Sequence, residues 1–170
     1  MLNRKTAHRH GLLLGCLALG LLTAPSPGRA EVLYKLETTC TIKGGAPVPC
    51  SVEAMNEGPS TLYLHKIGTA TETIRVTDSP VRMSRWIPAT KEWQSLQQAG
   101  ARFSSNTVCF NGLDLCVVNP NYLNSVRQDN ATAMATRDLV RVHFGDDGRI
   151  NITCYDEGCA LIQKTAAVQK

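Results

Sequence analysis

The sequence predicts a mainly β fold, an antiparallel meander that forms a small barrel-like or sandwich sheet with one or two short helices. Three observations predict it. Short runs in which apolar and polar residues alternate recur about 8 to 12 residues apart. Turn-forming Gly, Pro, Asn and Asp residues separate these runs. Outside the first thirty residues there is an even number of cysteines, as in small exported domains held by disulfides.

The first thirty residues predict a secretory signal peptide. Three basic residues precede an apolar stretch at 12–22, and small residues lead to a cleavage site near Ala30. The stretch is too short to span a bilayer as a helix, and no later one is long enough. A lipoprotein acylation site at Cys16 is the alternative, but most of the apolar stretch follows that cysteine. We therefore expect export to the periplasm or the extracellular space.

The remaining residues, 31–170, have a length typical of one domain. Of the 18 Lys and Arg residues, four lie in the first thirty, which leaves 14 against 14 Asp and Glu. The basic balance therefore belongs to the targeting segment. A neutral domain gives no reason to expect nucleic acid or an anionic membrane as a partner.

The most informative segment is 108–118, which predicts a β-hairpin with Asn111-Gly112 in its turn. A two-residue loop would place Cys109 opposite Asp114. A four-residue loop, 111–114, places Cys109 opposite Cys116 and makes the other face apolar. We favour the second register because it pairs like with like on both faces.

The cysteine spacing favours three local disulfides. Zinc coordination is the alternative, but there is no Cys-x-x-Cys pair and the expected compartment is oxidising. The predicted bridges are Cys40–Cys50, Cys109–Cys116 and Cys154–Cys159.

Five strands are expected before the hairpin. The first places Val32, Tyr34 and Leu36 on one face, and a Gly- and Pro-rich turn at 44–49 follows it. The expected strands are 32–42, 50–55, 61–67, 72–76 and 81–86.

Two segments predict helix. In 91–99 Trp93 and Leu96 share a helical face, and Gly100 can end the helix. Further on, Asn119 and Pro120 are an N-cap and a first helical residue for a turn carrying Tyr122, Leu123 and Val126. The polar segment 128–136 that follows is expected to be a surface loop.

A final hairpin is expected around a three-residue loop at 146–148, with Gly148 in the left-handed conformation. This register places Phe144 opposite Ile150, Val142 opposite Ile152 and Val140 opposite Cys154.

Residues that could carry chemistry are few. His65 and His143 are the histidines after residue 30, and each is expected on the polar side of a strand. There is no Gly-x-Ser-x-Gly or His-Glu-x-x-His motif. A small hydrolase using either histidine with a loop carboxylate is the alternative function. Asp146 and Asp147 are a weak calcium candidate, since Asp is also the residue that tight turns prefer.

The expected function is therefore an exported, non-enzymatic binding or structural module, with no cofactor and an unknown protein or carbohydrate as its partner. Binding is expected at three loop regions, 44–49, 111–114 with 119–122, and 86–93. Trp86 is expected to be more exposed than Trp93, which we place in the core. The candidate binding residues are Trp86, Trp93, Asn111, Asp114, Asn121 and Tyr122.

Overall fold

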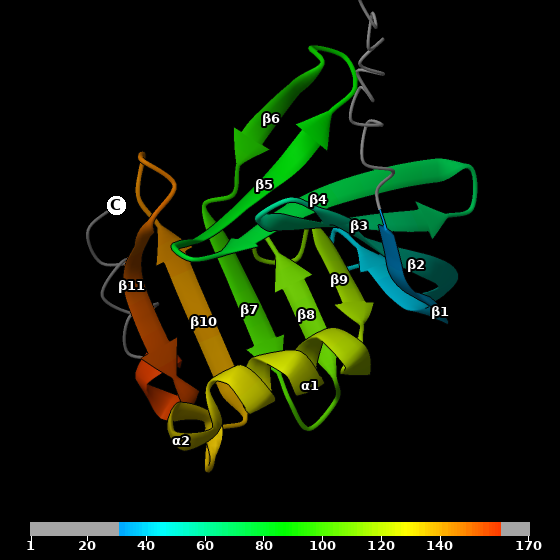
Figure 1. Cartoon of the computed structure of the whole chain (residues 1–170). Helices are drawn as coiled ribbons and strands as arrows, with labels where there is room; N and C mark the ends of the chain where they lie inside the picture. The colour runs from blue at the N-terminus through cyan, green and yellow to red at the C-terminus, as the bar shows by residue number, and fades with distance from the viewer. Residues whose placement is uncertain (1–30, 161–170) are drawn as a thin grey trace, which may run out of the picture.

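A computed structural model describes residues 31–160, so the predicted signal peptide lies outside the described residues. The predicted fold class is confirmed, because eleven antiparallel strands form one sheet that curls into a half-barrel (Figure 1). The strands are β1 (Glu31–Ile42), β2 (Val48–Glu57), β3 (Ser60–Ile67), β4 (Ala70–Asp78), β5 (Val81–Ile87), β6 (Glu92–Ser95), β7 (Gln98–Arg102), β8 (Thr107–Phe110), β9 (Leu115–Val118), β10 (Leu139–Phe144) and β11 (Ile150–Tyr155).

The first five strands form the expected meander, and β6 extends it by one strand that was not expected. The remaining strands lie beyond the other edge of β1, where β9 pairs with β1 and β10 pairs with β7. The spatial order is β11-β10-β7-β8-β9-β1-β2-β3-β4-β5-β6, so β6 and β11 are the two edges. Within residues 31–160 no helix is long and apolar enough to cross a membrane.

The predicted helix start at Asn119 is confirmed. The side-chain oxygen of Asn119 accepts a hydrogen bond from the backbone N–H of Tyr122 at 3.1 Å, and Pro120 occupies the first helical position. The helix, α1 (Pro120–Asp129), lies across one end of the half-barrel (Figure 1). The loop expected at 128–136 is wrong, because α1 continues to Asp129 and α2 (Ala131–Met134) follows it.

The core lies on the inner face of the curled sheet and beneath α1. Alternation along each strand sends one set of side chains inward, and Leu123 of α1, 1% exposed, packs onto them. The largest fully buried side chains are Ile74, Leu123, His65, Val52, Val117, Asn119 and Cys40.

The helix expected at 91–99 is wrong. Trp93 lies in β6 and pairs with Trp86 of β5, while Gln98 begins β7. Trp93 and Leu96 are three residues apart, which suits a helix. The same spacing also fits two short strands with a bend between them, and cross-strand pairing with β5 decides in favour of strand.

The register of the hairpin at 108–118 is confirmed. Cys109 lies opposite Cys116 and Phe110 opposite Leu115, around the four-residue loop. Asn111 and Gly112 both have positive φ, 47° and 76°, as the turn chemistry requires.

The register of the final hairpin is right only at its tip. Phe144 lies opposite Ile150 and Gly148 has a φ of 72°, as expected. A bulge at Asn151 then shifts the pairing, so His143 lies opposite Ile152 and Val142 opposite Thr153. Because a one-residue shift reverses the faces, Ile152 does not face the core and remains 42% exposed.

The face expected for Val32 in the first strand is wrong, because β1 contains a bulge. The register shifts between Val32 and Tyr34, so Val32 lies opposite Met55 and is 45% exposed. Tyr34 and Leu36 remain on the inner face with Ala54 and Val52.

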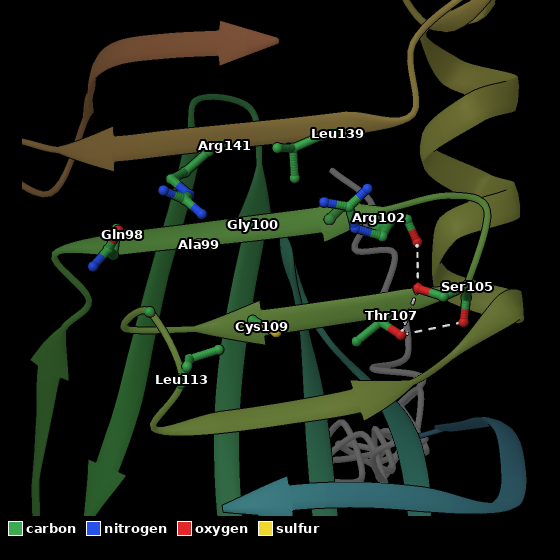
Figure 2. Close-up of a pocket in the computed structure, with 12 residues that line it drawn as sticks. Gln98, Ala99, Gly100, Arg102, Ser105, Thr107, Cys109, Leu113, Leu139 and Arg141 are labelled. Atoms are coloured by element: carbon green, nitrogen blue, oxygen red, sulfur yellow. Dashed lines mark hydrogen bonds between the residues drawn. The ribbon is translucent and has the colours of Figure 1, made fainter. Parts of the chain in front are cut away.

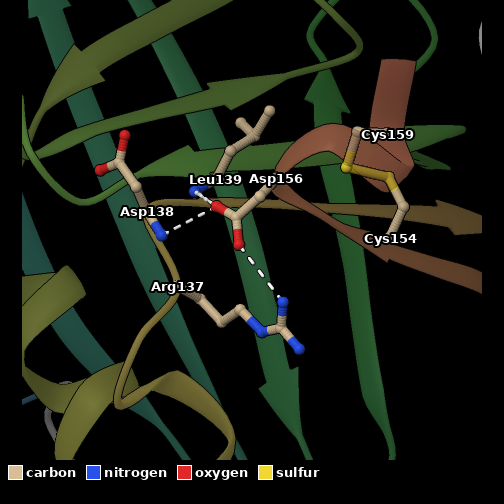
Figure 3. Close-up of a disulfide and its surroundings, with 6 residues drawn as sticks. All are labelled: Arg137, Asp138, Leu139, Cys154, Asp156 and Cys159. Carbon is tan, nitrogen blue, oxygen red and sulfur yellow. Dashed lines mark hydrogen bonds and ion pairs between the residues drawn. A yellow bond between two sulfur atoms is a disulfide. The ribbon is translucent and has the colours of Figure 1, made fainter. Parts of the chain in front are cut away.

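All three predicted disulfides are present, Cys40–Cys50, Cys109–Cys116 and Cys154–Cys159. They indicate an oxidising environment of the kind that exported proteins meet. Beside the third, the Asp156 carboxylate accepts hydrogen bonds from the backbone N–H groups of Asp138 and Leu139, at 3.0 and 2.9 Å (Figure 3). These bonds fasten the end of β11 to the beginning of β10.

Candidate binding site at the helix end of the half-barrel

The two ends of the half-barrel present different inner surfaces. At the end covered by α1 there is a hollow of about 630 Å³ between this helix, the beginnings of β1 and β3, and the turn from β4 to β5. We call it the tyrosine hollow. Its lining residues are Leu33, Tyr34, Thr61, Tyr63, Asp78, Val81, Asn121, Tyr122, Ser125, Val126, Asp129 and Asn130.

Three tyrosines from three separate elements meet in this hollow. The rings of Tyr63 in β3 and Tyr122 in α1 are 5.5 Å apart between centroids and 75° apart in plane, an edge-to-face pair. The hydroxyl of Tyr34 in β1 donates to Asn119 Oδ1 at 3.1 Å and lies 3.0 Å from Asn119 Nδ2. The residue that caps α1 therefore also positions the third tyrosine.

These tyrosines are neutral at physiological pH, and burial extends the range in which they stay neutral to higher pH. Desolvation raises the pKa of Tyr63, and nearby Tyr34, Tyr122 and Asp78 raise it further. Desolvation is also the main cause that raises the pKa of Tyr122. At physiological pH the hollow therefore offers phenol rings and hydroxyls that can donate or accept hydrogen bonds.

Two carboxylates lie at the rim of the same hollow. Asp78 is the last residue of β4 and Asp129 the last of α1. Burial raises the pKa of Asp78, and the like charge of Asp129 raises it further. Among residues 31–160 neither carboxylate has an ion pair. The lining residues include no Lys or Arg.

The opposite end of the half-barrel holds a hollow of about 300 Å³, which we call the ion-pair hollow. Arg85 donates two hydrogen bonds to the carboxylate of Glu72, both at 2.7 Å, so this pair is bidentate. Behind it lies His65, whose Nδ1 is 3.2 Å from the carbonyl oxygen of Glu72. Glu72 and Arg85 therefore neutralise each other, whereas Lys43 and Asp114, which also line this hollow, form no ion pair among residues 31–160.

The outer face of the sheet has a shallow hollow of about 290 Å³ over β7, β8 and β10 (Figure 2). Gly100, between Arg102 and Arg141, leaves the space that a side chain would fill. Arg102 is already paired with Asp138 at 3.0 Å. The hydroxyls of Ser105 and Thr107 bond to each other at 2.9 Å. Its other polar side chains are Gln98 and Arg141, and Arg141 forms no ion pair among residues 31–160.

Two further hollows are less suited to binding. One, of about 630 Å³ near α2, is lined by charges that pair with each other, Arg102 with Asp138 and Arg137 with Asp156. The other, beneath α1, is apolar but measures only about 110 Å³, below the size of typical ligand pockets, roughly 300–1,000 Å³.

The predicted candidate residues do not come together in one site. Trp86 and Trp93 lie on the outer face of β5 and β6, with ring centroids 5.3 Å apart and both rings half-buried. The guanidinium of Arg75 covers Trp93 at 3.9 Å from its centroid. Trp93 is therefore not in the inner core, and this aromatic surface is partly occupied.

The other loop candidates divide between the two ends. Asn111 and Asp114 line the ion-pair hollow, where the Asn111 side chain accepts a bond from the backbone N–H of Gln97 at 2.9 Å. Asn121 and Tyr122 line the tyrosine hollow. The loop at 44–49 lines neither.

The expectation that both histidines lie on the polar side of a strand is wrong for His65. His65 is not on a polar face, because it points inward, is 1% exposed and packs against Phe110 at 5.9 Å between centroids. Burial lowers the pKa of His65 to about 4, so the ring is neutral. His143 lies half-buried in β10. In the described part of the chain neither ring is hydrogen-bonded to a carboxylate, so the hydrolase alternative stays a prediction.

Asp146 and Asp147 behave as turn residues. Asp147 accepts a bond from the backbone N–H of Arg149 at 3.0 Å, and both aspartates are exposed. Over residues 31–160 there is no group of three or more His, Cys, Asp or Glu placed to hold a metal ion.

Of the twelve residues that line the tyrosine hollow, sequence reasoning proposed only Asn121 and Tyr122 and missed the other ten, among them Tyr34, Tyr63, Asp78 and Asp129. The one available signal in the sequence was the small number of tyrosines: the chain has four, and three of them line this hollow. Their separation along the chain hides the grouping until the sheet curls and α1 packs against it.

Comparison of the chain with protein-family models, with curated proteins and with solved structures finds no match.

Proposed function

We propose that this chain is an exported, non-enzymatic binding module whose ligand occupies the tyrosine hollow. The observation that carries the proposal is the meeting of Tyr34, Tyr63 and Tyr122 with two unpaired carboxylates in one hollow of about 630 Å³. That volume lies within the range of roughly 300–1,000 Å³ typical of ligand sites. The three disulfides support the exported location.

The lining supports binding rather than structure alone. Tyrosines offer a large rigid contact area together with a polar group, which is why they recur at recognition surfaces. In the ion-pair hollow, by contrast, the polar groups of Glu72 and Arg85 already bind each other. In the tyrosine hollow the carboxylates of Asp78 and Asp129 form no ion pair among residues 31–160, so a ligand would meet two uncompensated charges.

The experiment is ligand screening by NMR on the purified exported protein with isotope-labelled tyrosine rings. The panel contains simple sugars, amines and aromatic acids. We expect a binding compound to shift the ring signals of Tyr63 and Tyr122. The fourth tyrosine, Tyr155 in β11, lines none of these hollows and serves as an internal control.

Matched variants locate the site. Tyr63→Ala should abolish binding, whereas Tyr155→Ala should leave it unchanged. Binding that shifts only Tyr155, or that survives Tyr63→Ala, would contradict the proposal. Hydrolysis of chromogenic esters or glycosides that is lost in His65→Gln or His143→Gln would instead favour the hydrolase alternative.

A further inference from the structure

We infer that the tyrosine hollow recognises an ammonium group, a positively charged primary amine or quaternary ammonium carried by its ligand. This inference rests on the proposed function and specifies the class of ligand for that same hollow. Charge, ring geometry and the lack of competing cations among the lining residues each support it.

The charges around the hollow all have one sign. The lining contains the carboxylates of Asp78 and Asp129 and no basic side chain. Arg127, in the last turn of α1, lies over the ring of Phe103 at 4.6 Å from its centroid, and neither residue lines the hollow. Asp129 also ends α1, where the helix dipole contributes further negative potential. A cation entering the hollow would meet attraction on both sides.

The carboxylates also repel each other when the hollow is empty. Both carboxylates line the same hollow, and the charge of Asp129 lies close enough to raise the pKa of Asp78, which is partly withdrawn from water. A cation between them would relieve this repulsion. An anionic or neutral ligand would not.

The rings supply the second recognition element. The faces of tyrosine rings are electron-rich and attract cations, ammonium groups in particular. Because the planes of Tyr63 and Tyr122 differ by 75°, the two rings form a corner and not a flat stack. A small rounded cation fits such a corner, whereas a planar base, or the C–H face of a sugar ring, is better matched by a single flat aromatic face.

A hard metal cation fits this lining less well. Calcium takes about six to eight oxygen ligands, and magnesium needs near-octahedral geometry. Only two carboxylates reach the hollow, and its lining also includes three tyrosine rings and the apolar side chains of Leu33, Val81 and Val126. We therefore assign the hollow to an organic cation, with Mg²⁺ as a comparison in the test.

The test uses two pairs of probes that differ in charge but barely in shape. Choline is compared with 3,3-dimethyl-1-butanol, and n-butylamine with n-butanol, by titration calorimetry and tyrosine-ring NMR on the purified exported protein. At least one cation should bind about tenfold more tightly than its neutral partner, and it should shift Tyr63 and Tyr122.

Variants test each recognition element separately. Asp78→Asn and Asp129→Asn should each weaken cation binding several-fold, and Asp114→Asn, an exposed carboxylate at the ion-pair end, should not. Tyr63→Phe keeps the ring face and should retain binding, whereas Tyr63→Leu should lose it. Thermal melting of each variant separates loss of binding from loss of folding.

Binding should also weaken as the pH falls. The groups that face Asp78 are Asp129 and Tyr122 of α1, Tyr63 of β3 and Tyr34 of β1, and the tyrosines remain neutral throughout. Because the pKa of Asp78 is raised, its charge is lost before that of an ordinary Asp. Asp78→Asn should flatten this dependence.

The outcomes distinguish the two proposals. If a neutral sugar or aromatic acid shifts Tyr63 and Tyr122 while both cations fail, the ammonium inference is wrong and the proposed site stands. If no panel compound, cationic or neutral, shifts these rings, both proposals fail. Tighter binding of Mg²⁺ than of either organic cation would also overturn the inference.

Discussion

The two ends of the half-barrel are built on the same strands, yet their charges are resolved differently. β4 carries Glu72 near its beginning and Asp78 at its end. Glu72 is held by both nitrogens of a guanidinium, whereas Asp78 faces another carboxylate and three phenols. Glu72 is thus already occupied by Arg85, whereas the carboxylate of Asp78 is left available for a ligand.

The ends also differ in covalent reinforcement. Two disulfides, Cys40–Cys50 and Cys109–Cys116, lie within two residues of the lining of the ion-pair hollow. The tyrosine hollow has none among its lining residues and depends on α1. One end is therefore the stable part of the scaffold, and substitutions there should affect folding more than binding.

The largest expected effect comes from the disulfide at the stable end. Cys40→Ala with Cys50→Ala should lower the free energy of unfolding by about 3 kcal/mol, because a closed loop no longer restricts the unfolded chain. Urea denaturation measures the change. The disulfide Cys154–Cys159 closes a shorter loop, so Cys154→Ala with Cys159→Ala should lower the free energy of unfolding by about 2 kcal/mol. Choline affinity should be unaffected by the first pair. A reduced affinity would show that the two ends are coupled.

The next effect is a pH dependence of stability at His65. The pKa of His65 is about 4 in the folded chain and 6.5 in the unfolded chain. Between these pH values the unfolded chain binds a proton at His65 and the folded chain does not. Stability is therefore full well above pH 6.5 and should fall by about 3 kcal/mol as the pH is lowered to 4. Denaturation at a series of pH values measures this. His65→Gln should remove the slope and His143→Gln should keep it. An unchanged slope in His65→Gln would refute this account.

A smaller effect is expected from Glu72→Gln. The variant leaves Arg85 partly buried without a counter-charge, since the side chains are 25% and 35% exposed. The free energy of unfolding should fall by about 1–2 kcal/mol, between the values for exposed and buried pairs. Glu92→Gln, an exposed residue of β6, is the matched control and should change stability by less than about 0.5 kcal/mol.

The smallest effect should have the opposite sign. Asp78→Asn removes the repulsion with Asp129, so at pH 7 it should raise the free energy of unfolding by roughly a few tenths of a kcal/mol after solvent screening. Because the folded pKa of Asp78 is raised, this gain should disappear as the pH falls and the native carboxyl becomes protonated. Thermal melting at pH 7 and pH 4 checks both points. A destabilised Asp78→Asn at pH 7 would remove the contrast between the two ends.

Short-range patterns predicted this fold well. The hairpin at 108–118 depends on residues at most ten apart, and its turn residues, alternation and cysteines agree on one register. Asn119 and Pro120 likewise specify the beginning of α1 locally. Such features need no knowledge of the remaining chain.

Long-range features could not be obtained in the same way. Trp93 belongs to a strand because Trp86 pairs with it, and no local pattern records that partner. The tyrosine hollow requires Tyr34 in β1, Tyr63 in β3 and Tyr122 in α1 to meet after the sheet has curled. Of this site the sequence indicated only Asn121 and Tyr122, through the turn they follow. The bulge at Asn151 was hidden for a related reason, since alternation in β11 continues on both sides of it.

That bulge has a consequence for solubility. β11 is an edge of the sheet, and Ile150 and Ile152 are exposed along it. An uninterrupted row of backbone donors and acceptors beside such side chains would template pairing with another molecule. The extra residue breaks the even spacing of that row, so the bulge disfavours regular pairing with a neighbouring chain at Asn151. The bulge thus lowers the tendency of this edge strand to aggregate.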